Sequence, residues 1–125
     1  MIQGSVTPNR EATLCLTLLR ADGDTHQLDV IIDTGYTGWL TLSPEIARQL
    51  GLSFRRFERA RLADGSEVAF SVYDATVLWD GEARVVHVDA VGVEPLVGMS
   101  MMDGYRISID DKDGGAVTIE QLAAP

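Results

Sequence analysis

Cysteine and basic side chains are both scarce in this sequence. Its single cysteine, Cys15, excludes an intramolecular disulfide, and the apolar residues around it predict a buried and unreactive thiol. Lys and Arg number 10 against 19 Asp and Glu, which gives a formal net charge of -9 at pH 7. A nucleic-acid partner is therefore not expected, because binding to phosphates needs clustered Lys and Arg.

Long apolar runs and metal-binding patterns are missing as well. No apolar run reaches the roughly 18 residues that span a bilayer, and the N-terminus lacks the basic and apolar regions of a signal peptide. His26 and His87 have no cysteine or carboxylate at metal-ligand spacing. We therefore expect no metal, no cofactor and no membrane partner. Together with the lone cysteine, these absences predict a cytoplasmic protein.

The sequence does contain a series of short apolar segments separated by turn residues. The length of 125 residues predicts one domain, and the aromatic fraction of 6% predicts a core made mainly of Val, Ile, Leu and Met. Strands are predicted over residues 1–6, 12–19, 26–32, 39–42, 57–62, 67–78, 83–91, 105–109 and 116–119. Many short strands with one or two brief helices indicate an all-β, barrel-like domain.

Two short helices are predicted between these strands. The first begins after Ser43, a good N-cap residue, has Pro44 at its first position and ends at Gly51. The second begins with residues 99–102, has one to two turns and ends at Gly104, and its methionines are expected to fill the core or an interface.

Two charged segments are interpreted as solvated surface. The acidic stretch 111–120 superficially resembles a calcium-binding loop, but Ile109 would occupy its first ligand position, so a hairpin turn is expected there. A basic cluster falls at strand-like spacing and is expected to face solvent; it consists of Arg55, Arg56, Arg59 and Arg61.

The chain is organised around residues 28–42, which read LDVIIDTGYTGWLTL. The pattern predicts a strand, a tight loop and a second strand, with Asp33 at the end of the first strand. Gly35 follows on the loop and allows another backbone or a substrate to come close. Taken alone, Asp33-Thr34-Gly35 is also typical of a turn that merely ends a strand.

A second signal lies near the other end of the chain. Pro95-Leu96-Val97-Gly98 holds two apolar residues and a glycine, about 60 residues after Asp33-Thr34-Gly35. The two motifs together resemble those of the retropepsin-like, single-domain branch of the aspartic proteases, and the resemblance covers residues 12–120. It implies the closed β-barrel of the acid-protease fold with one lobe per chain.

The resemblance also implies a mechanism that needs two chains. In these enzymes two carboxylates share a proton, and one activates water while the other donates toward the scissile carbonyl. This sequence supplies one Asp-Thr-Gly, so a homodimer is implied in which the two copies of Asp33 meet at a two-fold axis. Thr34 would hydrogen-bond across that axis, and Gly35 would let the two loops approach. Val97 and Gly98 would support the catalytic loop from behind.

A hairpin in the middle of the chain falls where the family has its flap. Asp64-Gly65 between alternating segments is a strong hairpin signal, and an ordinary hairpin is the alternative interpretation. Tyr36 follows the first motif where Ala or Ser is usual, and it is expected to line or narrow the subsite next to Asp33. The tip that would contact an extended polypeptide substrate consists of Ala63, Asp64, Gly65 and Ser66.

The sequence departs from the viral members of the family in one supporting contact. Viral retropepsins carry an Arg soon after the glycine of the second motif, paired with an Asp just past the first. Here Met99-Ser100 follows Gly98, and Thr37-Gly38 follows Tyr36, so that ion pair is absent. The pattern is more similar to the uncharacterised prokaryotic branch of the family.

The main functional interpretation is a homodimeric aspartic endopeptidase that hydrolyses peptide bonds, with an acidic to mildly acidic pH optimum. One alternative is a non-catalytic, dimeric peptide-binding or scaffold module of the same fold. Another is a latent protein that needs a partner or acid before it becomes active. The presence of Asp33 favours an enzyme, because facing carboxylates repel and are of no use to a scaffold.

Overall fold

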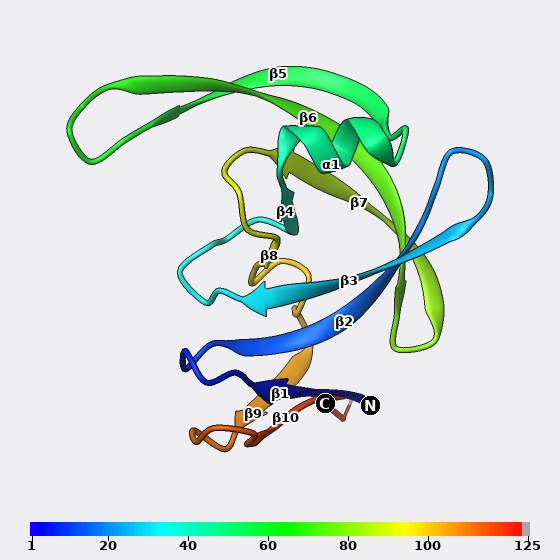
Figure 1. Cartoon of the computed structure of the whole chain (residues 1–125), viewed down its shortest axis with the longest axis vertical. Coiled ribbons are helices and arrows are strands. Elements are labelled where there is room, and N and C mark those ends of the chain that lie inside the picture. The colour runs from blue at the N-terminus through cyan, green and yellow to red at the C-terminus, as the bar shows by residue number, and fades with distance from the viewer. Residues whose placement is uncertain (124–125) are drawn as a thin grey trace.

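The computed structural model describes residues 1–123, which form ten strands and one helix (Figure 1). The elements are β1 Ile2–Val6, β2 Ala12–Leu19, β3 Thr25–Ile32, β4 Leu40–Leu42, α1 Pro44–Gln49, β5 Ser53–Arg61, β6 Glu67–Trp79, β7 Glu82–Ala90, β8 Leu96–Val97, β9 Tyr105–Ile109 and β10 Ala116–Gln121. The prediction of a predominantly β chain is confirmed.

All ten strands belong to one sheet that closes on itself. The strand order is β5-β6-β7-β4-β8-β3-β2-β1-β10-β9, and β6 pairs additionally with β2. That pairing joins Thr17 to Leu78 and Leu18 to Val77, so the six strands from β6 to β2 form a ring. Closure removes the open edges of this ring, whereas β5 and β9 remain the outer strands of the whole sheet. The predicted barrel-like architecture is confirmed.

Strand β8 is inserted between β3 and β4. It runs parallel to β3, with Ile32 opposite Val97, and antiparallel to β4, with Leu40 opposite Val97. Segments from the beginning and the end of the chain therefore lie side by side at the centre of the sheet (Figure 1). This insertion brings the two sequence motifs together.

The core inside the ring is mainly aliphatic, as predicted. Alternating residues of each strand point inward, so consecutive core positions are two residues apart. The completely buried side chains include Leu18, Val30, Leu40, Val77, Val88 and Val97. Trp79 is the aromatic exception; its ring packs edge-on against Tyr105 with 5.8 Å between ring centroids.

Only the first of the two predicted helices exists in the described part of the chain. The side chain of Ser43 accepts a hydrogen bond from the amide of Ile46 and caps α1, and Gly51 follows with a φ of 66°.

No helix within residues 1–123 has the length and apolar character to cross a membrane.

The second helix was predicted wrongly. Residues 99–104 form successive turns instead, and the amide of Met101 donates to Gly98 O while that of Tyr105 donates to Met102 O. Each bond spans three residues, and the segment between two glycines is too short for a regular helix. Met101 and Met102 are buried in the core, as expected, whereas Met99 is 44% exposed.

Cys15 is exposed, which contradicts the predicted buried thiol. It lies on β2 between Leu14 and Leu16, whose side chains are both buried. Because side chains alternate along a strand, the side chain between two inward leucines must face solvent.

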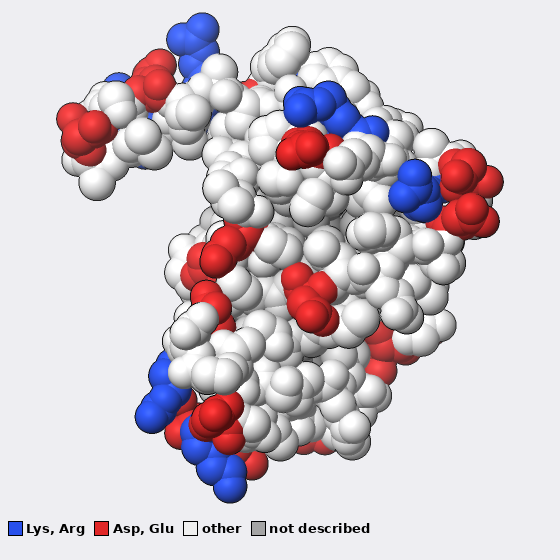
Figure 2. Space-filling model, in the orientation of Figure 1, with Lys and Arg blue, Asp and Glu red and all other residues white. Residues whose placement is uncertain are grey.

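The charged segments are solvated, as predicted. The four arginines of the basic cluster are exposed on β5, where Arg55 pairs with Asp74 and Arg56 with Glu58. Figure 2 shows acidic and basic side chains together on the projecting β5–β6 hairpin. Residues 110–115 connect β9 to β10 as a hairpin.

The ring closure should depend on Leu18, which is fully buried where β2 meets β6. We expect Leu18→Ala to lower the free energy of unfolding by about 2–5 kcal/mol, because a cavity remains in a core that relaxes only partly. Leu78 belongs to the same strand pairing but is 41% exposed, so Leu78→Ala should cost about 1 kcal/mol or less. Urea unfolding measures both values, and equal losses would contradict this packing.

Candidate active site

Asp33 stands directly after β3 at the start of a tight loop. Its amide donates to Val97 O at 2.9 Å, and its Oδ1 accepts a hydrogen bond from the Gly35 amide at 2.9 Å. The amide of Tyr36 donates back to Asp33 O at 3.2 Å. The carboxylate is thus held at the end of a central strand while remaining partly exposed. Thr34 and Gly35, the other two residues of the motif, are exposed.

The second motif packs behind this loop. The amide of Gly98 donates to Trp39 O at 3.0 Å, and that of Met99 donates to Tyr36 O at 2.8 Å. A Cβ atom on Gly98 would collide with the carbonyl oxygen of Gly38 and with the ring of Tyr36. Only glycine lets the two segments lie this close. Val97 is fully buried beside it.

An open cleft of about 510 Å³ lies in front of Asp33. Its walls come from the loop that follows β3, from the β5–β6 hairpin and from the segment that leads into β8. Figure 2 shows the hollow beneath the projecting hairpin. The lining residues share a largely apolar character interrupted by three carboxylates; they are Asp33, Gly35, Tyr36, Thr41, Ala60, Leu62, Val68, Phe70, Asp89, Val91, Gly92, Val93, Glu94 and Leu96.

The flanks of the β5–β6 hairpin line the cleft, whereas its tip does not. Ala60 lies opposite Val68 in the strand register, and both face the cleft together with Leu62 and Phe70. The four residues predicted from the turn form the tip outside the cleft lining: Ala63, Asp64, Gly65 and Ser66. The flanking residues were missed, although the alternation along the strands places them on one face.

The tip itself is an internally hydrogen-bonded turn. The Leu62 amide donates to Ser66 O at 2.7 Å, and Gly65 adopts a φ of 87°. Asp64 Oδ1 accepts from both the hydroxyl and the amide of Ser66, and these bonds hold the pKa of the Asp64 carboxyl below its usual range. Contact between this tip and a substrate stays a prediction.

Tyr36 lines the cleft and is hydrogen-bonded to a second lining residue, Asp89. Its hydroxyl donates to Asp89 Oδ2 at 2.6 Å, and Asp89 lies opposite Thr41 where β7 pairs with β4. Burial of the ring, followed by the bond to Asp89, raises the pKa of the Tyr36 hydroxyl well above its ordinary value. The phenol therefore stays neutral and acts as a donor. The Asp89 carboxylate was not found by sequence reasoning, because no local pattern connects it to Tyr36.

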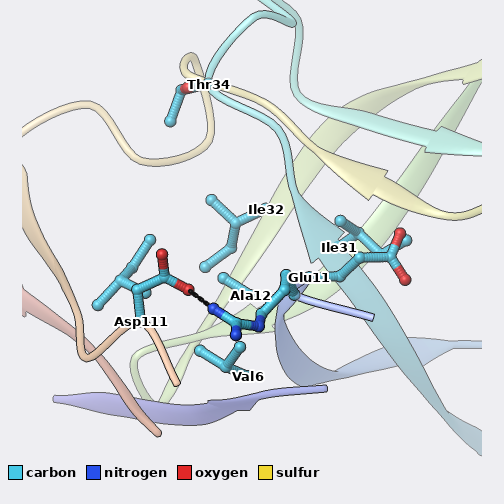
Figure 3. Close-up of a pocket in the computed structure, with 9 residues that line it drawn as sticks. Val6, Glu11, Ala12, Ile31, Ile32, Thr34 and Asp111 are labelled. Atoms are coloured by element: carbon cyan, nitrogen blue, oxygen red, sulfur yellow. Dashed lines mark ion pairs between the residues drawn. The ribbon is translucent and has the colours of Figure 1, made fainter. Parts of the chain in front are cut away.

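Thr34 lies on the other side of the loop, at one end of a second groove (Figure 3). The loop thus separates two hollows, one in front of Asp33 and one beside Thr34. Within residues 1–123, no second carboxylate is hydrogen-bonded to Asp33, and no three His, Cys, Asp or Glu side chains gather closely enough to hold a metal ion.

The Tyr36–Asp89 hydrogen bond should show itself in the pH dependence of stability. Above about pH 10 the unfolded chain loses the phenol proton while the folded chain keeps it, so folding stability falls as the pH rises. We expect Tyr36→Phe to weaken that alkaline fall, and to cost about 1–3 kcal/mol at neutral pH because Asp89 loses its donor. Tyr73→Phe is the control. Urea unfolding at neutral and alkaline pH measures both effects, and parallel pH curves for the two variants would refute the assignment.

Comparison with protein-family models and with curated proteins found no match for this sequence. Among solved structures, the chain is similar to a retropepsin-like aspartic protease from Rickettsia conorii. The two chains share 17% sequence identity with a TM-score of 0.60, and the similarity covers 98% of this chain and 91% of the other. The chain therefore has the retropepsin-like fold.

Proposed function

We propose that the protein is an aspartic endopeptidase that acts as a homodimer, with one Asp33 from each copy. The observation that carries the proposal is the position of Asp33. Its carboxylate stands at the end of a central strand, on a loop fixed to β8, and it opens into a cleft under a projecting hairpin. The retropepsin-like fold supports the same conclusion.

A second copy is needed because a lone carboxylate cannot perform both steps of the reaction. One carboxylate of a close pair stays ionised and takes a proton from water, while the other keeps a proton and donates it toward the scissile carbonyl. The chain supplies a single Asp-Thr-Gly, so the partner carboxylate comes from an identical loop related by two-fold symmetry. The exposed Thr34 and Gly35 beside Asp33 leave this loop accessible to its copy.

The cleft suits an extended polypeptide. Apolar side chains such as Val68, Phe70 and Leu96 line it and would accept alternate side chains of a substrate strand. The β5–β6 hairpin acts as a flap in this proposal, closing over the bound peptide and excluding water. Its inner flanks, which line the cleft, would supply the contacts to the peptide.

Activity should rise toward acidic pH. Each copy carries a formal net charge of -9, so two copies repel each other most strongly when their carboxylates are ionised. Partial protonation weakens that repulsion and favours the dimer. We expect cleavage of a mixed peptide library to peak at acidic to mildly acidic pH, and a rate that stays flat from acidic to alkaline conditions would contradict this dependence.

The decisive variant is Asp33→Asn. It keeps the side-chain volume and the acceptor for the Gly35 amide but cannot ionise, so it should abolish peptide cleavage while the chain stays folded. Asp29→Asn is a matched control, because Asp29 is an exposed carboxylate on the same strand. It should leave cleavage unchanged.

The same measurements separate the protease from a binding module. Undiminished turnover in Asp33→Asn would reject the proposed mechanism. A parent protein that cleaves nothing but still binds extended peptides would favour the non-catalytic module instead. Inhibition by a hydroxyl-bearing, statine-type peptide would independently support two carboxylates that share a proton, because such a group resembles the tetrahedral transition state.

A further inference from the structure

The cleft in front of Asp33 carries charge of one sign only. Its lining includes three carboxylates, from Asp33, Asp89 and Glu94, and no Lys, Arg or His. Within residues 1–123, neither Asp89 nor Glu94 forms an ion pair with a basic side chain. Figure 2 shows acidic side chains at the edge of the hollow beneath the hairpin. The proposed reaction uses only Asp33, so the other two carboxylates are available to a substrate.

Asp89 is held in a fixed position on the cleft wall. It belongs to β7, where it lies opposite Thr41 of β4 and Val72 of β6. Its Oδ2 accepts the hydrogen bond from Tyr36 at 2.6 Å, the only hydrogen bond that the Asp89 side chain forms within residues 1–123. A carboxylate offers about four acceptor positions on its two oxygens. Asp89 can therefore accept further donors from a molecule in the cleft.

The rest of the cleft wall suits the stem of a long side chain. Val68 and Phe70 line the cleft from the β5–β6 hairpin, and Leu96 lines it from β8. Lysine and arginine bury their methylene stems against apolar surface while the charged end reaches a polar group. An apolar wall that holds one fixed carboxylate is therefore complementary to a basic side chain.

The same carboxylate would act against an uncharged side chain. In the proposed enzyme, the hairpin closes over the bound peptide and excludes water. A carboxylate that is closed off from water without a counter-charge is costly, and an apolar side chain beside it supplies none. A cation satisfies Asp89, whereas an apolar group leaves it unsatisfied, so attraction and penalty both favour the basic residue.

From this arrangement we infer that Asp89 is a specificity-determining residue that selects peptides with a Lys or Arg side chain close to the scissile bond. The inference rests on the proposed function, because it concerns the substrate of the same cleft. The Tyr36 amide donates to Asp33 O at 3.2 Å, and the Tyr36 hydroxyl donates to Asp89. One tyrosine side chain thus spans the interval from the loop to Asp89. Because an extended peptide rises about 3.3 Å per residue, the basic residue lies within about three positions of the scissile bond.

The proposed homodimer would repeat this subsite by symmetry. Each copy contributes one Asp89, so a basic residue should be favoured at one position on each side of the scissile bond. The net charge of -9 would also attract cationic peptides, but without regard to the position of the charge in the peptide. Dependence on position therefore distinguishes the subsite from general attraction.

The test begins with the parent protein and matched peptides. One series places a single lysine at successive positions of an otherwise uncharged sequence, and a second series replaces it by acetyl-lysine, which is long but uncharged. At the favoured positions, kcat/KM should be at least about tenfold higher for lysine, because a hydrogen bond between charged groups is lost in the other series. At remote positions, in physiological salt, the two series should agree to within about twofold. Equal cleavage of the two series at every position would overturn the inference, and this result depends on no variant.

Asp89→Asn tests the carboxylate itself. The amide oxygen of asparagine can still accept from the Tyr36 hydroxyl, and urea unfolding checks that the fold is kept. The preference for lysine over acetyl-lysine should fall to about threefold or less. A purely structural role would slow both peptides and leave their ratio unchanged, which would refute the assignment. Asp29→Asn removes the same charge outside the cleft lining and should keep the ratio.

Glu94→Gln is the matched variant inside the cleft. Glu94 is exposed, so solvent screens its charge and a pair formed there contributes little. This variant should lower the preference for lysine by about threefold or less. If Glu94→Gln removes the preference and Asp89→Asn does not, Glu94 selects the basic residue and the assignment to Asp89 is wrong.

Binding measurements separate the subsite from the chemistry. Fluorescence anisotropy with labelled lysine and acetyl-lysine peptides measures affinity in the Asp33→Asn protein. A preference for lysine that disappears when Asp89→Asn is added, in a protein whose parent cleaves nothing, would support the subsite and reject the protease. Cleavage that requires Asp33 but shows no preference for lysine would support the protease and reject the subsite. A parent protein that neither cleaves nor binds these peptides would overturn both.

Discussion

The site depends on the insertion of β8 between β3 and β4. The amide of Asp33 donates to Val97 O, and the amides of the two residues that follow Gly98 donate to carbonyl groups of the Tyr36–Gly38 stretch. Backbone polar groups at the end of a central strand need partners, and here one segment supplies them to the whole loop. The loop is therefore held by main-chain hydrogen bonds, and the Asp33 side chain remains available.

The Tyr36–Asp89 hydrogen bond extends this fixation to the wall of the cleft. A partly buried carboxylate is costly unless a donor satisfies it, and the neutral phenol provides that donor. Gly38 is part of the same arrangement, since a Cβ atom there would collide with the Tyr36 ring. Tyr36, the bulky residue after the Asp-Thr-Gly motif, thus fits because Gly38 leaves room for its ring and Asp89 on β7 accepts a hydrogen bond from its hydroxyl. Its hydroxyl joins the loop to Asp89 on β7.

Local signals in the sequence were sufficient for most of the fold but for only part of the site. The bounds of β2 and the cap of α1 follow from alternation and from Ser43, which act over a few residues. The burial of Cys15 was predicted wrongly because its residue type was given more weight than the alternation of side chains along the strand. That alternation places the Cys15 side chain on the outside. The cleft lining depends on non-local registers, such as Ala60 opposite Val68 and Thr41 opposite Asp89. No local pattern encodes those registers.

The loop that carries Asp33 has two faces with different surroundings, which is compatible with the proposal that one chain is half of an active site. The face with Asp33 opens to a mostly apolar cleft under a hairpin, which an extended peptide would occupy. The face with Thr34 borders a groove that ends at an exposed ion pair. In the proposed homodimer, a partner that completes the carboxylate pair would have to approach without filling the cleft in front of Asp33. In the proposed dimer, whose copies each carry a formal net charge of -9, acidity would govern both the chemistry and the formation of the site.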